Sequence, residues 1–314
     1  MSKNAIGFVA PLVGDMHSQF AGILPLPQNE STRTMKILKT LIYTLLVLAS
    51  CLFVSKTSAD LVVGGFNGSR SGNFGFASGS QFSGFRNGIA ANYAGVSFTG
   101  SSVLTTSYLD TIDVLIVGPA TNFASGTALT SSEQTALLGF VQSGGGVILM
   151  PDNDTYQSGA DAINESYTDP FGVDITGTNS GLVNTTIVGP VHPVTNGPYG
   201  SVSSFAMNFP GWFDHVNGGT VLGSALGQPR LLAFDFGSFG VSSGRVVMFS
   251  DINWANSGSF GYYNNAQNSR LALNSFDYVV PISNIPEPGS FVFGLSALSV
   301  LTFYQSIRRR RTDQ

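Results

Sequence analysis

Acidic side chains follow two apolar runs of the chain, and their types and spacing suit them to chemistry. Asp152 and Asp154 come directly after the run Val147–Met150, and Asp251 comes soon after the run Val246–Phe249. Carboxylate oxygens bind Ca²⁺, and they also accept hydrogen bonds from sugar hydroxyls. A hydrolase acting on glycans or peptides would use such carboxylates as its acid and base. The three aspartates are therefore candidate ligand-binding residues, with a hydrolase as the alternative function.

Whether these carboxylates form one site depends on where the two apolar runs lie. If both are strands of a parallel sheet, their carboxyl ends meet at the edge where such folds bind ligands. We then expect Asp152 and Asp251 to be close, with their repulsion offset by a cation, by hydrogen bonds or by an arginine such as Arg70. The alternative, which we favour, is that Asp152 and Asp251 only cap turns and helix starts. The segment from Asp152 to Asp154 lacks the glycine and glutamate of an EF-hand loop, so the presence of a metal is left open.

Histidine and cysteine are scarce. His192 lies in the stretch GPVHPVTNG, where it is a further candidate ligand-binding residue, and His215 lies in GWFDHVNGG. A histidine beside a proline in a turn more often makes a structural hydrogen bond than it catalyses a reaction. Cys51 is the only cysteine, no Gly-x-Ser-x-Gly motif occurs, and the glycine-rich loop after the first apolar run is not G-x-G-x-x-G. The sequence therefore predicts no zinc site, no catalytic residue and no cofactor.

The strands and helices around these residues follow an α/β pattern. The continuous apolar run 113–118 is typical of a strand in a parallel sheet. Thr130 and Glu133 have the spacing of a capping box before a helix over 131–142, and Gly144–Gly146 ends that helix. The run 147–150 then predicts the next strand, which completes a right-handed crossover unit.

The remaining apolar runs predict one domain over residues 60–283. Residues between the 147–150 strand and position 220 are rich in glycine, asparagine and threonine, which predicts a loop-rich middle. The 231–234 and 244–251 strands are expected to pair as a hairpin. Further strands are predicted near 61–63, 96–98 and 220–222, and helices over 80–92 and 266–279.

Five short motifs occur in order along the domain: IDVLIVGPA, LTSSEQTALLGFVQSGGGVILMPD, HPVTNG, SGRVVMFSDINW and NSRLALNSFDYV. Together they resemble class I glutamine amidotransferase-like domains, which are flavodoxin-like and occur in many exported proteins. The resemblance implies a three-layer α/β sandwich with a mostly parallel sheet. Catalytic members carry a cysteine on the turn after a central strand, but here that turn reads PDND. We therefore expect a non-catalytic binding or structural domain, with the hydrolase through Asp152, Asp154 and Asp251 as the alternative.

The C-terminal segment predicts a membrane anchor. Residues 290–307 are 18 residues without charge, which as a helix span roughly 27 Å, and Arg308, Arg309, Arg310 and Arg311 follow at once. A positive cluster beside a span marks its cytoplasmic side, so the preceding domain would lie outside.

Pro286, Glu287 and Pro288 stand just before this span. A Pro-Glu-Pro motif, a short apolar helix and an arginine cluster in this order resemble the PEP-CTERM sorting signal of Gram-negative bacteria. The resemblance covers residues 284–314 and implies processing by an exosortase near the Pro-Glu-Pro motif. Tails with this motif are also labelled ice-binding protein C-terminal domains, and that label is no sign of ice binding.

Residues 35–59 predict a secretory signal peptide. A basic start at Met35–Lys39 is followed by the apolar run Leu41–Val54, and Thr57-Ser58-Ala59 suits cleavage by signal peptidase after Ala59. Met35 would then be the true initiator, and residues 1–34 would be an extension added in error when the gene start was assigned. The alternative is a lipobox in which Cys51 is lipidated; we favour cleavage after Ala59, because the apolar run continues past the cysteine.

Composition limits the partners of the domain. From Asp60 to Ile285 the chain has five arginines, no lysine and 14 acidic residues, a formal charge of −9. A surface of this charge repels the phosphates of nucleic acids, so no nucleic-acid partner is expected. The expected partners are the membrane before processing, the exosortase, signal peptidase and, as an open candidate, surface polysaccharide. The expected location is the inner membrane as a precursor and then the cell surface or the medium.

Overall fold

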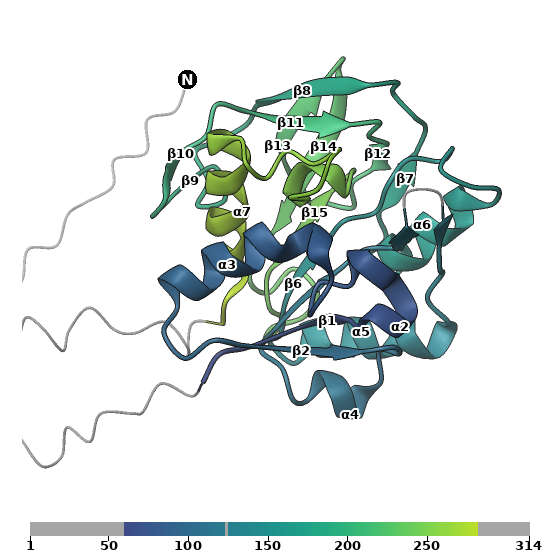
Figure 1. The fold of residues 1–314 in the computed structure, drawn as a ribbon, viewed down its shortest axis with the longest axis vertical. Coiled ribbons are helices and arrows are strands. Elements are labelled where there is room, and N and C mark those ends of the chain that lie inside the picture. The colour runs from purple at the N-terminus through teal and green to yellow at the C-terminus, as the bar shows by residue number, and fades with distance from the viewer. Residues whose placement is uncertain (1–59, 123–124, 282–314) are drawn as a thin grey trace, which may run out of the picture. The chain divides into compact units, whose positions relative to one another are not determined.

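The computed structural model describes residues 60–122 and 125–281 (Figure 1). The predicted extension, the signal peptide with Cys51 and Ala59, the Pro-Glu-Pro motif and the arginine cluster all lie outside these residues. Within the described ranges, no helix combines the length and the apolar character needed to cross a membrane. The spanning helix predicted over residues 290–307 falls beyond them.

A nine-stranded sheet organises the described part of the chain, in the order β11-β8-β13-β14-β15-β6-β3-β1-β2. The strands from β15 to β2 pair in parallel with their neighbours. In chain order they occupy the positions 2-1-3-4-5, which is one of the two common orders of doubly wound sheets. Their bounds are β1 (Val62–Phe66), β2 (Ser97–Ser101), β3 (Val114–Val117), β6 (Gly146–Leu149) and β15 (Val246–Phe249).

The other half of the sheet is antiparallel. Each neighbour from β15 through β14, β13 and β8 to β11 runs opposite to the one before it. The expected hairpin partners, β14 and β15, do pair in this way. The expectation of a mostly parallel sheet therefore holds for the half from β15 to β2 only. The bounds here are β8 (Leu182–Ile187), β11 (Ser204–Asn208), β13 (Thr220–Ala225) and β14 (Gln228–Phe234).

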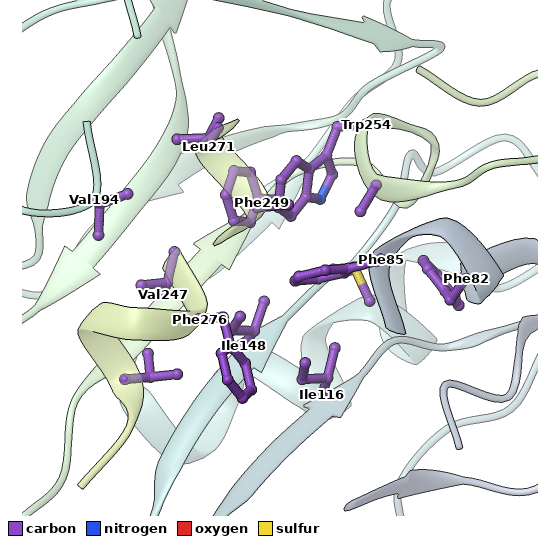
Figure 2. Packing of buried hydrophobic residues seen from close by; sticks show 14 of the residues in the cluster. Phe82, Phe85, Ile116, Ile148, Val194, Val247, Phe249, Trp254, Leu271 and Phe276 are labelled. Atoms are coloured by element: carbon purple, nitrogen blue, oxygen red, sulfur yellow. The ribbon is translucent and has the colours of Figure 1, made fainter. Parts of the chain in front are cut away.

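Helices cover both faces of the sheet and give three layers, as predicted. Successive residues of a strand point to opposite faces, so Val114 and Ile116 of β3 enter one core while Leu115 and Val117 enter the other. Figure 2 shows the first core, where Phe85 and Phe276 lie near Ile116 and Ile148. The first face is covered by α3 (Ser83–Asn92) and α7 (Ala266–Val279), and the second by α4 (Thr106–Leu109), α5 (Ser131–Gln142) and α6 (Ala160–Thr168).

Local sequence explains where the main helices begin. The predicted capping box is present at α5: the Thr130 hydroxyl accepts the Glu133 N–H at 3.3 Å, and the Glu133 carboxylate accepts the Thr130 N–H at 2.9 Å. Asn265 caps α7 through a 2.9 Å bond from Gln267 N. The middle of the chain, predicted as loop-rich, also contains α6, β8 and β11.

Short elements connect these parts. They are α2 (Gly68–Ser71), η1 (Gly72–Phe74), η2 (Ser80–Phe82), β4 (Ala120–Asn122), β5 (Ser125–Gly126), η3 (Asp169–Phe171), β7 (Asp174–Thr176), β9 (Asn196–Gly197), β10 (Gly200–Ser201), β12 (Trp212–His215) and η4 (Asn253–Ala255).

The described chain starts and ends at one edge of the sheet, the amino edge, where the parallel strands begin. Asp60 lies just before β1. At the other end of the chain, α7 runs back against the sheet so that Val279 packs on Gly146, the first residue of β6. The opposite edge, the carboxyl edge, is where the parallel strands end and where the predicted carboxylates must lie.

Candidate functional site

A cavity of about 330 Å³ opens at the carboxyl edge. Asp152 and Asn153 line it from the turn after β6, and Asn253 lines it from the turn after β15. β11 also ends at this edge, because two antiparallel reversals separate it from β13 and two more separate β13 from β15. Its last residue, Asn208, and the following Phe209 complete this side of the cavity.

The structure brings Asp152 and Asp251 together, as expected. Both are buried, with 7% and 0% of their surfaces exposed. Burial raises the pKa of Asp152 to about 6. Burial raises the pKa of Asp251 well above its usual range, and the nearby charge of Asp152 raises it further. Two buried carboxylates this close favour retaining a proton between them at mildly acidic pH.

Asp251 is held entirely by the protein. One carboxylate oxygen accepts the Asn208 N–H at 2.7 Å and the other accepts the Asn253 N–H at 2.8 Å. Its charge acts on the buried Arg230, whose pKa burial lowers to about 10, so that the guanidinium stays cationic at neutral pH. Asp251 is absent from the lining of the cavity. The bond from Asn253 N is the local turn capping that the alternative described. The bond from Asn208 N goes further, because it ties this turn to the end of β11.

Arg70, the arginine given as one possible partner of the carboxylates, binds elsewhere. Arg70, in α2, makes a 2.5 Å ion pair with Glu133 and stacks 4.2 Å from the centre of the Phe66 ring. It thereby joins the loop after β1 to the start of α5. Arg230, on β14, is the arginine whose charge reaches Asp251.

Asp152 lines the cavity, and hydrogen bonds from the described residues use only one of its two carboxylate oxygens. Its Oδ1 accepts the backbone and side-chain N–H groups of Asn153, at 2.8 and 3.0 Å. Its backbone is fixed by Asn164 of α6, which accepts the Asp152 N–H at 3.0 Å and donates to the Asp152 carbonyl at 2.7 Å. Among the residues that the structure describes, none donates a hydrogen bond to Oδ2. Asp152 can therefore accept a bond from a ligand.

Asp154 belongs to a different contact. Its Oδ2 accepts bonds from Gly177 N and from the Thr176 hydroxyl, the latter at 3.2 Å, so that it fastens the turn after β6 to the end of β7. It does not line the cavity. Across residues 60–122 and 125–281, no group of three or more His, Cys, Asp or Glu side chains is arranged to hold a metal ion. The three aspartates thus do not converge on one ligand.

His192 lies at the amino edge, away from the cavity. Its ring packs edge-on against Tyr278 near the end of α7, with centroids 4.8 Å apart. Nδ1 accepts the Val194 N–H at 3.2 Å, and Nε2 is 3.8 Å from Asp235. Burial lowers the pKa of His192, so the ring is neutral at pH 7. The structural alternative given for this histidine fits these contacts.

The structure adds residues that the sequence did not single out. Phe209 has its backbone in the left-handed region, at φ 55°, and its side chain is 45% exposed at the cavity. Phe260 also lines the cavity and is 56% exposed. A phenylalanine in a loop of small and polar residues is the available sequence signal, since such loops rarely need a large apolar side chain.

Stacked aromatic rings pack beside the turn that carries Asn253. Trp254, in η4, lies flat on Phe249 at the end of β15, with ring centroids 3.5 Å apart and planes 16° apart (Figure 2). The Trp254 carbonyl also accepts a 2.8 Å bond from Asn268 of α7. This packing fixes the neighbouring Asn253, which lines the cavity.

A larger hollow, of about 570 Å³, opens at the amino edge beside Pro281. Asp113 and Arg245 contribute to its lining. It lies at the edge opposite to the one where doubly wound sheets bind ligands, so we place the candidate site in the cavity that contains Asp152.

Comparison with known proteins leaves the family of the chain open. No family model matches it, and no curated protein does. Among solved structures, the N-terminal domain of mmIFT52 is similar with a TM-score of 0.49 and 11% identity, over 70% of this chain and 97% of that one. A cytoplasmic protein of Salmonella typhimurium LT2, STM1381, gives 0.47 and 13% over 70% and 98%. A ThuA-like protein of Bacteroides uniformis gives 0.44 and 15% over 73% and 96%.

Proposed function

We propose that the described domain is a non-catalytic ligand-binding domain of an exported bacterial protein. The observation that carries this proposal is the cavity at the carboxyl edge. It offers one buried carboxyl group and exposed aromatic rings, and its lining among the described residues contains no cysteine, serine, histidine, lysine or arginine. Its hydroxyl groups belong to Thr155, which donates to Asn153 Oδ1 at 2.9 Å, and to Tyr156. The described lining therefore lacks the serine–histidine or cysteine–histidine pair of a nucleophilic enzyme but can still bind a ligand.

The resemblance to amidotransferase-like domains supports the same conclusion. The parallel strands have the flavodoxin-like order 2-1-3-4-5, and the turn after β6 is where that resemblance places the cysteine nucleophile. This turn carries Pro151 and Asp152 instead, and Asp152 faces the cavity. We infer that the fold retains the ligand position of such domains without their reaction.

The hydrolase alternative loses its support at the site. Glycoside hydrolysis requires two carboxyl groups on either side of the bond that breaks. Asp251 is fully buried and both of its oxygens already accept hydrogen bonds, while Asp154 is tied to β7. Asp152 is the one carboxyl group in the described lining.

Export rests on the sequence. The signal peptide ending at Ala59 and the tail with Pro286, Glu287 and Pro288 support passage through the inner membrane, anchoring by the apolar segment, and processing by an exosortase. The processed protein would then reside at the cell surface or outside the cell.

Expression of the full chain in a Gram-negative host with an active exosortase tests this part of the proposal. Mass spectrometry of surface material should find a chain that begins at Asp60 and lacks Arg308–Arg311. A host without the exosortase is the control, and there the tail should remain. Intact tails in the presence of active exosortase would contradict the proposal.

The non-catalytic part is tested separately with a broad panel of glycosidase and peptidase substrates. The full chain should give no more turnover than its Asp152→Asn variant. Turnover that is lost in Asp152→Asn would instead establish an enzyme.

A further inference from the structure

We propose that the cavity at the carboxyl edge binds the terminal residue of a neutral carbohydrate, which stacks on Phe209 and Phe260 and donates a hydroxyl to Asp152. This inference rests on the proposed function and names the ligand class of the same cavity. Three properties of the site carry it: its charge, its exposed rings and its unused hydrogen-bonding groups.

The charge of the cavity excludes anionic ligands. No lysine, arginine or histidine belongs to its described lining, and Asp152 is its carboxyl group. A phosphate, sulfate or carboxylate ligand would meet this carboxyl group without a compensating cation, in a domain whose net charge is already negative. A ligand without negative charge is therefore required.

The exposed rings favour a ligand with flat apolar faces. Phe209 and Phe260 are 45% and 56% exposed, although both are large apolar side chains. A left-handed backbone at a phenylalanine costs about 1–3 kcal/mol, which persists only where the surroundings enforce it. Here Phe209 N donates to Gly181 O at 2.9 Å, and Asp251 holds the preceding residue, Asn208. The fold thus keeps the Phe209 ring exposed at a cost in stability. The C–H face of a sugar packs well on such an aromatic ring.

The polar groups favour hydroxyls over a quaternary ammonium ion. An ammonium ion would also suit aromatic rings and a carboxylate, but it forms no hydrogen bonds when fully alkylated. Asp152 Oδ2 has no donor among the described residues. The Asn208 side-chain amide likewise has no hydrogen-bond partner in the described part of the chain. Asn208 is held through its backbone, whose N–H donates to Asp251 and whose carbonyl accepts from Asn253. A ligand that left these groups unpaired would lose affinity, whereas a sugar hydroxyl can donate to one and accept from the other.

The size of the cavity indicates a short ligand segment. Its volume of about 330 Å³ is near the lower limit of ligand pockets, which run from about 300 to 1,000 Å³. This volume suits the end of a glycan rather than a long section of it. Recognition of a chain end also agrees with a cavity formed by turns at one edge of the sheet.

Saturation-transfer-difference NMR on the full chain tests this proposal. The chain is held in a polyoxyethylene detergent, because this headgroup contains neither a sugar nor an ammonium group that would compete with the probes. The probes are methyl glycosides of glucose, galactose, mannose and N-acetylglucosamine, with choline and glucuronate as charged comparisons. We expect at least one neutral glycoside to bind with a millimolar Kd, and choline and glucuronate to give no signal.

Two variants connect the binding to the cavity. Phe209→Asn removes the ring but suits the left-handed backbone, so the variant should fold and bind at least about tenfold more weakly, as expected for losing about 1.4 kcal/mol or more. Phe236→Ala is the matched control, because Phe236 is also 56% exposed but lines the hollow at the amino edge. It should bind as the parent chain does. Thermal unfolding of both variants confirms that they are folded.

The outcomes separate this inference from the proposed function. If no glycoside binds, or if Phe209→Asn binds as well as the parent chain, the carbohydrate proposal is wrong. If choline binds and Phe209→Asn abolishes that binding, the ligand class is wrong but the binding domain stands. If methanol is released from a bound methyl glycoside, the ligand class stands and the non-catalytic function is wrong.

Discussion

Asp152 and Asp251 have the same side chain and neighbouring positions, but different tasks. Asp251 accepts two backbone N–H bonds and is fully buried, so it fixes the loops around the cavity. Asp152, which lines the cavity, accepts both of its side-chain bonds from Asn153 through one oxygen, and no described residue donates to the other. The capping interpretation of the sequence therefore fits Asp251, and ligand binding is proposed for Asp152.

The contribution of Asp152 and Asp251 should make the protein more stable in mild acid than at neutral pH. Folding raises the pKa of Asp152 from 3.8 to about 6 and also raises that of Asp251, so the folded state binds more protons. Their contribution is complete below pH of about 4 and is lost as the pH rises through about 6 and above. Asp152→Asn should reduce this loss and stabilise the chain at pH 7 by about 1–3 kcal/mol.

Urea unfolding of the parent chain and of Asp152→Asn at pH 5 and pH 7 measures the effect. Asp110→Asn, which changes an exposed aspartate, is the control and should follow the parent chain. If the free energy of unfolding of Asp152→Asn changed with pH as much as that of the parent chain, the carboxyl pair would not be the origin of the pH dependence.

At the scale of elements, asparagine side chains from the helices fix the turns of the site. Asn164 of α6 pairs with the backbone of Asp152. Asn268 of α7 bonds both the N–H and the carbonyl of Ala206, at 2.9 and 2.8 Å, which covers the outer edge of β11. An uncovered edge strand would invite pairing with another chain. The two asparagines thus join helix packing to the geometry of the cavity.

Two glycine substitutions should have opposite effects on stability, because Gly146 lies in the contact between β6 and α7 and Gly139 lies on the exposed side of α5. A Cβ at Gly146 would lie 2.0 Å from the Val279 carbonyl oxygen, so Gly146→Ala must push α7 away from the sheet. We expect a loss of at least about 2 kcal/mol in the free energy of unfolding. A Cβ at Gly139, in α5, meets nothing within 4 Å, so Gly139→Ala should stabilise by about 0.5–1 kcal/mol. Chemical denaturation of both variants checks this, and equal effects would refute the packing argument.

Elements with a strong local pattern were predictable, and those that depend on distant pairing were not. The capping box and apolar face of α5 and the run in β15 are visible in the sequence. β8 reads LVNTTI, whose polar residues gave it the character of a loop, although alternate residues are buried. β11 pairs only with β8 among the described strands, so missing one strand hid the other. The carboxylates of the site were predictable because they follow apolar runs that are visible in the sequence. The position of Phe209 was not, because it follows β11.

At the scale of the whole molecule, the position of its lysines makes export measurable. All four lysines lie at or before Lys56, and the rest of the chain has none. Cleavage after Ala59 would therefore leave one reactive amine, the new α-amino group at Asp60.

Labelling with an amine-reactive reagent followed by intact-mass analysis should give one added label on surface material. The uncleaved chain that begins at Met35 should accept up to four, on Lys36, Lys39, Lys56 and its N-terminus. A lysine-containing surface form would contradict cleavage after Ala59. Lipidation at Cys51 would retain Lys56 and would also block the new N-terminus, which distinguishes the lipobox alternative.

The described chain enters and leaves the fold at the amino edge, whereas the cavity opens at the carboxyl edge. A tether attached through either end therefore holds the domain at its amino edge, opposite to the cavity. Its binding mouth then faces away from the attachment point, so that tether and ligand do not compete for space. Many copies held in this way on one surface would all present the same face outward, and a polymer passing over them could meet several mouths at once.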